Sequence, residues 1–160
     1  MNPVLLATDG SPTAAKATDT AVELARLLDT ELVVVCVWDI AYAAVGLAPM
    51  PIDGELAKME EEEARKVASE AAARAEEVGL EARAVILRGQ PVVEICLAAE
   101  TYEPRFLVVG SHGRRAVKRA LFGSVSTGVL HHAKCPVLVV RGEARDIETT
   151  AERPQEEVHA

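Results

Sequence analysis

Five short β-rich runs alternate along this chain with longer segments of helical periodicity, and this alternation limits the fold more than any other feature. The runs are rich in valine, leucine and alanine, and they occupy residues 4–8, 32–38, 81–88, 106–109 and 137–140. The second run is apolar throughout, which is typical of a parallel strand covered on both faces. Strands separated by helices predict an α/β fold with a five-stranded, doubly wound parallel sheet.

The segments between the runs have the pattern of amphipathic helices. Four helices are predicted, covering residues 12–28, 55–78, 91–103 and 124–133. The first has small and aliphatic side chains on one face: Ala14, Ala17, Ala21, Leu24, Ala25 and Leu28. The second is rich in glutamate and alanine, and Gly79 is its stop signal. The glycines and prolines of residues 39–54 predict a loop.

The length and composition fit a single folded domain with a short tail. A chain of 160 residues is long enough for one domain, and 49% of its residues are hydrophobic. We assign residues 1–142 to the domain. Residues 143–160 hold six acidic and two basic residues with little apolar content, so we predict a disordered acidic tail.

The few aromatic residues and the cysteines exclude other classes of protein. Aromatic residues make up 3% of the chain, too few for a surface that stacks nucleic-acid bases. The three cysteines are an odd number without metal-ligand spacing, which favours a reducing compartment. The N-terminus lacks a basic signal-peptide region, and no apolar stretch is long enough for a bilayer. We predict a cytoplasmic protein that binds no membrane.

A glycine motif follows the fourth β-rich run. It reads Gly110-Ser111-His112-Gly113, then nine residues, then Gly123-Ser124 at the expected start of the last helix. Glycines let a backbone approach an anion closely, and the free N–H groups of a helix N-terminus hold negative charge. The motif therefore predicts a phosphate site. It is neither the lysine-containing P-loop nor the dinucleotide fingerprint, which would follow the first strand.

The charge distribution agrees with a site for a small anion. The chain has a net charge of −8, yet residues 104–142 hold no acidic residue and seven basic ones. The rest of the chain therefore sums to −15, which would repel a nucleic acid. The alternative for the basic cluster from Arg114 to Arg119 is a solvated loop or helix face.

With these motifs the chain resembles a known family, the universal stress proteins, over about residues 3–141. The resemblance rests on these segments: Ala7-Thr8-Asp9-Gly10-Ser11, Val34 to Asp39, Val108 to Ser126 with its glycines, and Cys135 to Val140. The glycine motif is that of the ATP-binding branch. The resemblance implies the Rossmann-like fold of the adenine nucleotide alpha hydrolases, with strand order 3-2-1-4-5. Strands 1 and 4 would then be neighbours, and both distinctive loops would line one crevice.

The resemblance also implies a set of ligand contacts for ATP with Mg²⁺ or Mn²⁺. Adenine and ribose would lie against Ala7, Thr8, Asp9 and Val37, with Gly110 passing close to the ribose. The phosphates would be held by backbone N–H groups and two serine hydroxyls, from Gly113, Gly123, Ser124, Val125 and Ser126. The metal would be held mainly by the phosphates, with Asp9 as its candidate ligand from the protein.

Each of these assignments has a structural alternative. Asp9 is also suited to cap the following helix or to form an Asx-turn. The glycines are also suited to turns alone, and His112 to an exposed loop position. The apolar segment from Pro136 to Val140 is implied to pair across a two-fold axis in a homodimer, and the alternative is a covered edge in a monomer.

The expected function is that of a regulatory, ATP-binding protein of the stress response. One alternative is an interaction module that binds another adenine nucleotide, such as cyclic AMP, or none. Another is a slow ATPase, because phosphoryl transfer needs a group that orients the nucleophile and the sequence identifies none. We therefore assign no catalytic residue.

Overall fold

The computed structural model describes residues 2–38, 54–113 and 123–142. Strands and helices alternate in it as predicted, with bounds within two residues of the expected ones. The elements are β1 (Val4–Ala7), α1 (Pro12–Leu27), β2 (Leu32–Trp38), α3 (Gly54–Glu76), β3 (Ala82–Arg88), α4 (Pro91–Tyr102), β4 (Phe106–Gly110), α5 (Ser124–His132) and β5 (Val137–Val140). The predicted loop up to residue 53, the basic cluster from Arg114 to Arg119 and the acidic tail lie outside the described residues.

The five strands form one parallel sheet in the order β3-β2-β1-β4-β5, which confirms the expected fold and strand order. β1 lies at the centre, and Ala7 at its end is in register with Val35 of β2 and Val109 of β4. The chain runs outward from β1 to β3 first, and then returns to add β4 and β5 on the other side. This reversal makes the end of β1 the switch point at which doubly wound sheets bind ligands.

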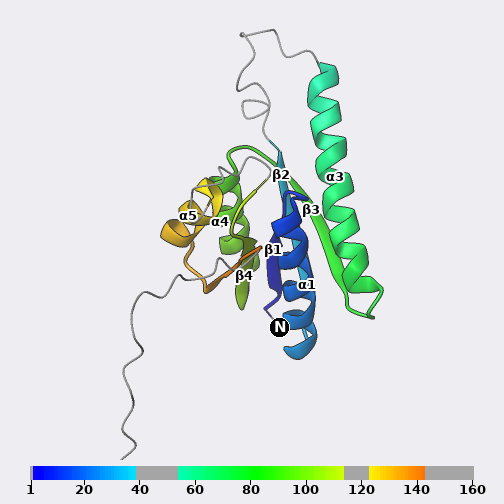
Figure 1. Cartoon of the computed structure of the whole chain (residues 1–160), viewed down its shortest axis with the longest axis vertical. Helices are drawn as coiled ribbons and strands as arrows, with labels where there is room; N and C mark the ends of the chain where they lie inside the picture. Colours follow the sequence, from blue (N-terminus) through cyan, green and yellow to red (C-terminus); the bar gives the residue numbers. More distant parts are fainter. Residues whose placement is uncertain (1, 39–53, 114–122, 143–160) are drawn as a thin grey trace, which may run out of the picture.

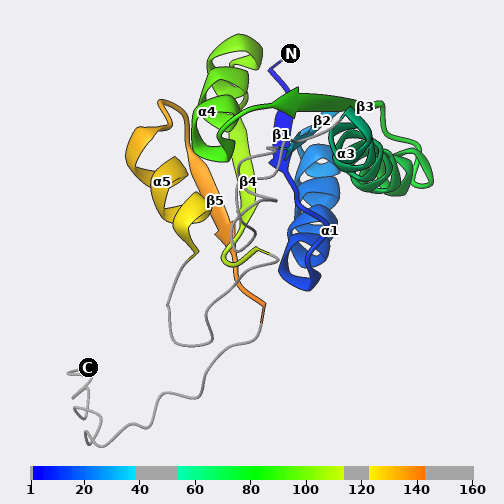
Figure 2. The same ribbon diagram turned by 90° about the horizontal axis from the view of Figure 1, so that it is seen from above.

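Helices cover both faces of the sheet, α1 and α3 on one face and α4 and α5 on the other (Figures 1 and 2). Neighbouring residues of β1 alternate between the two cores, since Val4 and Leu6 pack with α1 and α3 whereas Leu5 packs with α4 and α5. All three are fully buried. Burial of each such side chain contributes about 1.5–3 kcal/mol to folding. The valine-rich runs therefore become the middle layer.

Alanines bring the helices close to the sheet. The buried face of α1 includes Ala14, Ala17, Ala21 and Ala25, as the helical spacing predicted. Along α3 the buried residues begin at Ala64 and continue to Ala75. The first ten residues of α3 contain no buried side chain, so this helix lies against the sheet only along its second part.

The two edges of the sheet differ in character. The β3 edge carries charge, since Arg83 forms an ion pair with Glu31 (2.8 Å) and lies over the ring of Tyr102. The β5 edge is apolar from Val137 to Val140, and Leu138 is 37% exposed. Charged residues protect an edge from pairing with another strand, whereas an apolar edge favours it.

The three cysteines are free thiols. Cys36 is buried in β2, and Cys96 and Cys135 are half-buried free thiols. Within the described ranges, no helix has the length and apolar character needed to cross a bilayer.

Candidate functional site

The carboxyl ends of β1 and β4 lie side by side and place the two distinctive loops against each other. β1 ends where the Thr8 N–H donates to Val35 O of β2 (3.0 Å). The loop after β1 then meets the loop after β4, because the Ser11 hydroxyl donates to His112 O (3.3 Å). The structure therefore brings together the two loops that the sequence singled out.

Asp9 adopts the Asx-turn that was its structural alternative. Its Oδ1 accepts from the Ser11 N–H (3.0 Å). The cap of α1 is Ser11, whose Oγ accepts from the Ala14 N–H (3.2 Å). The turn leaves the second carboxylate oxygen facing the glycine loop, since a Cβ added to Gly113 would lie 2.6 Å from Asp9 Oδ2. The absence of a side chain at Gly113 therefore leaves room for the Asp9 carboxylate beside the glycine loop.

The glycine loop is closed by hydrogen bonds around one carbonyl. Ser111 O accepts from the Gly123 N–H (2.7 Å) and from the Ser126 hydroxyl (3.1 Å). The same hydroxyl also lies 3.0 Å from Gly123 O, and Ser126 is 2% exposed. On the other side, the Ser111 N–H donates to Val140 O at the end of β5 (2.7 Å). The Gly123 N–H and the Ser126 hydroxyl thus hold the loop itself.

The N-terminus of α5 follows the glycine loop, and no side chain of the described residues caps it. Gly123 is its N-cap residue and makes no side-chain capping bond. The first intrahelical bond is donated by Thr127 to Gly123 O (3.0 Å). The N–H groups of Ser124, Val125 and Ser126 precede that bond, so they form the positive end of the helix dipole. Ser124 is exposed, and its hydroxyl is accessible from solvent.

Val37 offers backbone groups to the same crevice from β2. In a strand, the N–H and C=O of one residue point to the same edge, and the next residue points to the other. Val35 O points toward β1, whereas Trp38 O accepts from the Gly89 N–H (3.0 Å) after β3. The polar groups of Val37 therefore face the β1 side, at a level where β1 has already ended.

Gly110 lies where α1 approaches β4. A Cβ added to Gly110 would lie 3.2 Å from the backbone N of Ala14, in the first turn of α1. The neighbouring His112 is half-buried, and its Nδ1 lies 3.0 Å from the Ser111 hydroxyl. The start of the loop is therefore packed against the first turn of α1.

Three of the seven basic residues of 104–142 are among the described residues, and they are divided between the two ends of the sheet. Arg141 follows β5 at its carboxyl end, on the same side as the glycine loop. Arg105 precedes β4 and Lys134 precedes β5, so both lie at the amino ends of the strands, opposite the crevice. Lys134 is also paired with Glu100 of α4 (2.8 Å). The positive field at the glycine loop stays a prediction, because four of its seven cations lie outside the described residues. Arg114, Arg115, Lys118 and Arg119 lie outside the described residues.

No group of three or more histidine, cysteine or acidic residues forms a metal cage in the part of the chain that the structure describes. The Asp9 carboxylate at the mouth of the glycine loop is a single oxygen donor group. Together with the uncapped helix it fits a nucleotide whose phosphates carry the metal, as Mg²⁺ is commonly bound.

Comparison with known proteins agrees with this geometry. The model of the universal stress protein family matches residues 1–141. The chain belongs to the universal stress protein family. The universal stress protein YxiE of Bacillus subtilis is 35% identical over 147 residues, which cover 88% of this chain and 99% of YxiE.

Solved structures share this fold, and one of them is named a universal stress protein. The structure of MJ0577, a protein whose biochemical function was assigned from its structure, has a TM-score of 0.77 and 29% identity and covers 91% of this chain and 99% of its own. A universal stress protein in complex with cAMP has a TM-score of 0.64 and 26% identity, covering 89% of this chain and 98% of its own.

Proposed function

We propose that this universal stress protein binds ATP in the crevice at the carboxyl ends of β1, β2 and β4, and that it acts as a regulatory, nucleotide-dependent homodimer in the response to stress. The observation that carries the proposal is the uncapped start of α5 directly after a glycine loop. Such a helix end is an anion-binding site, because its free N–H groups and dipole favour negative charge. The resemblance to the ATP-binding branch of the family supports ATP as the nucleotide.

The residues of the crevice divide into three groups along the ligand. The backbone of Val37 would read the edge of adenine, and Ala7 and Thr8 would line the nucleoside. Asp9 and Gly110 would meet the ribose, with Asp9 close enough to Gly113 to approach a metal on the phosphates. The N–H groups of Gly113, Ser124, Val125 and Ser126 would hold the phosphates.

Gly123 and Ser126 would contact the ligand through fewer groups than the family resemblance implies. The Gly123 N–H and the Ser126 hydroxyl are engaged with Ser111 O. We therefore propose that Gly123 serves the ligand by close approach and that Ser126 serves it through its backbone N–H. The exposed Ser124 hydroxyl is the better phosphate donor of the two serines.

A cyclic nucleotide is the competing ligand, since a structural relative is a complex with cAMP. The test begins with the nucleotide content of the purified protein, followed by calorimetric titration of stripped protein with ATP and Mg²⁺ or with cyclic AMP. We expect ATP to bind the more tightly, because a triphosphate reaches the start of α5. Tighter binding of cyclic AMP, or no nucleotide binding, would contradict the proposal.

ATP turnover is expected to be slow. Efficient phosphoryl transfer needs a placed metal, a cationic clamp and a group that orients the nucleophile. The described residues of the crevice offer backbone N–H groups, small hydroxyls and Asp9, which suit binding. Release of phosphate within seconds at saturating ATP would contradict this view.

The homodimer would form through the apolar edge from Pro136 to Val140. Pairing of this edge with the same edge of a second copy, about a two-fold axis, would cover Leu138. It would also leave no open edge on this side for another strand. We expect Leu138→Asp to convert a dimer to a monomer, measured by light scattering after size exclusion. Leu27→Asp is the matched control, since Leu27 is a 72% exposed leucine on α1. A monomeric wild-type protein, or a Leu138→Asp protein that stays dimeric, would contradict this assignment.

A further inference from the structure

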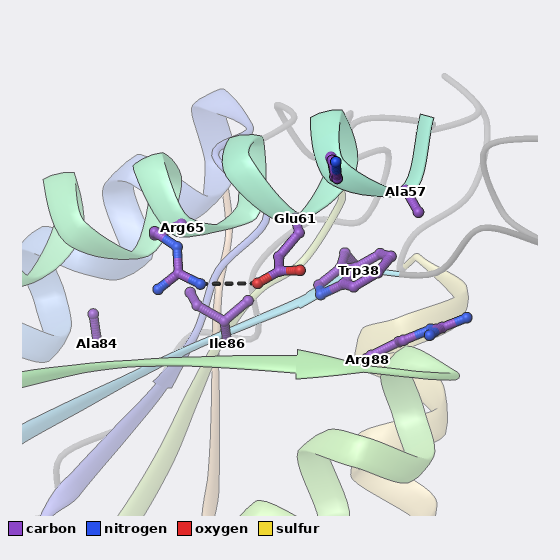
Figure 3. A pocket seen from close by; sticks show the side chains of 8 residues that line it. Trp38, Ala57, Glu61, Arg65, Ala84, Ile86 and Arg88 are labelled. Carbon is purple, nitrogen blue, oxygen red and sulfur yellow. Dashed lines mark hydrogen bonds and ion pairs between the residues drawn. The ribbon is translucent and has the colours of Figure 1, made fainter. Parts of the chain in front are cut away.

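A pocket of about 580 Å³ lies between the first part of α3 and the ends of β2 and β3 (Figure 3). It exists because the buried face of α3 begins only at Ala64, so the helix start stands away from the sheet. Small side chains at Ala57 and Ala84 leave the space open from both sides. Its volume is in the range of pockets that bind small organic ligands.

The pocket is separate from the nucleotide crevice. Trp38 lines it, and Trp38 and Ile86 pack with the core under α1 and α3. Val37, one residue earlier, packs with the core under α4 and α5. Adjacent residues of a strand point to opposite faces, so β2 itself divides the pocket from the other layer.

Three cations and one carboxylate surround the pocket. Lys58 and Arg65 come from α3, and Arg88 comes from the end of β3. Glu61 is the carboxylate, and it accepts from Arg65 (2.9 Å), as the dashed line in Figure 3 shows. Neither Lys58 nor Arg88 forms an ion pair with a carboxylate of the described residues. The pocket thus carries an excess of two positive charges in a chain whose net charge is −8.

Apolar surface lies beside these charges. The Arg88 guanidinium lies over the Trp38 ring, 5.2 Å from its centroid, and Ile86 lies on the same face of the strands. A ligand that matches this lining combines an apolar body for Trp38 and Ile86 with an anionic group for Lys58 and Arg88. Charge complementarity selects such ligands over neutral or cationic ones of the same shape.

We propose that this pocket is a second ligand site, which takes a small organic carboxylate with an apolar body. It is independent of the nucleotide site and of the proposed function. Trp38 makes the site testable, because it is the one tryptophan in the chain and its indole N–H gives a single, assignable NMR signal.

The experiment titrates the full-length protein with 1-naphthoate and follows the Trp38 indole signal. The same titration with 1-naphthylmethylammonium keeps the aromatic body and reverses its charge. We expect saturable shifts with naphthoate and none with the ammonium compound. Equal shifts with both compounds, or no saturable shift with naphthoate, would overturn the proposal.

Variants then assign the binding to the pocket. Lys58→Gln and Arg88→Gln each remove one cation, and we expect each to weaken naphthoate binding by about tenfold. Lys66→Gln, an exposed α3 residue away from the lining, is the matched control and should bind as the wild type does. Unchanged affinity in the Lys58→Gln, Arg88→Gln double variant would overturn the proposal.

Two further controls separate this site from the nucleotide crevice and from unfolding. Circular dichroism of each variant verifies the fold before its affinity is compared. Saturating ATP should leave the naphthoate affinity unchanged. Competitive displacement of naphthoate by ATP would mean that the pocket belongs to the nucleotide site, and the proposal would then be wrong.

Discussion

The nucleotide crevice and the α3 pocket are built from different parts of the chain. The crevice is made of backbone: the end of β4 meets α1 at Gly110, the two loops approach at Gly113, and no side chain of the described residues caps the start of α5. The pocket is made of side chains, with the ring of Trp38 and cations from α3 and β3 around an open volume. Ligand binding to a backbone site is therefore tested by adding a side chain at a glycine. Ligand binding to a side-chain site is tested by removing a charged or aromatic side chain.

This difference has consequences for binding. Backbone N–H groups are fixed by the fold, so they lose little conformational entropy when a phosphate arrives. Lys58 and Arg88 are exposed and must be ordered around a ligand. We therefore expect tight, geometry-dependent binding in the crevice and weaker, salt-sensitive binding in the pocket.

The largest effect is expected from a side chain in the glycine loop. Gly113→Val places a Cβ 2.6 Å from Asp9 Oδ2, so the Asp9 carboxylate must move away from the position it holds at the glycine loop. We expect ATP affinity to fall about 100-fold, since two or more charge-assisted hydrogen bonds are lost. Gly54→Val is the control, because a Cβ at Gly54 meets no atom within 4 Å. Calorimetric titration of both variants measures the difference, and equal affinities would remove Gly113 from the site.

The two serines of α5 should separate loop stability from ligand contact. Ser126→Ala removes the buried hydroxyl that donates to Ser111 O, and we expect the free energy of unfolding to fall by about 1 kcal/mol. Ser124→Ala removes an exposed hydroxyl, so it should lower ATP affinity by several-fold without a change in stability. Urea unfolding together with ATP titration tests both, and a loss of stability in Ser124→Ala instead would reverse the assignment.

The smallest effect concerns thiols that lie in neither site. Burial raises the pKa of Cys96, and the neighbouring Cys135 and the Glu100 carboxylate raise it further. Burial also raises the pKa of Cys135. Both thiols should therefore be protonated at pH 7 and react slowly with iodoacetamide, with a rate that rises as the pH approaches their pKa values.

Glu100→Gln removes one of these causes. Alkylation of Cys96 should then become faster by a few-fold at most, because exposed charges interact weakly. The rate at Cys135 should stay the same, since its pKa is raised by burial, and mass spectrometry of the modified peptides reads both rates. A slower reaction at Cys96 in Glu100→Gln would contradict the assigned cause.

Much of the fold could be predicted from the sequence because its signals are local. Valine-rich runs, alanines at helical spacing and the stop at Gly79 each act within a few residues. The order of the strands is not local, since periodicity does not say which strands pair. It came from the family resemblance, and the register of Ala7 with Val109 confirms it.

The candidate site could be predicted only in part. The glycine motif located the loop, but it could not tell that the Gly123 N–H and the Ser126 hydroxyl bind Ser111 O. A count of charges along residues 104–142 could not show that Arg105 and Lys134 lie at the amino ends of the strands, away from the glycine loop. The α3 pocket gave no signal at all, since it unites Trp38, Lys58 and Arg88, which are far apart in the sequence.

The most direct test of the nucleotide site is one titration of ATP and Mg²⁺ into three proteins: the wild type, Gly123→Val and Arg88→Gln. A Cβ at Gly123 would lie 3.3 Å from Ser111 O, at the start of α5, whereas Arg88 lines the other pocket. We expect Gly123→Val to lose about 100-fold in affinity and Arg88→Gln to bind as the wild type does. Unchanged binding in Gly123→Val, or loss of binding in Arg88→Gln, would contradict an ATP site formed by the backbone at the carboxyl ends of the central strands.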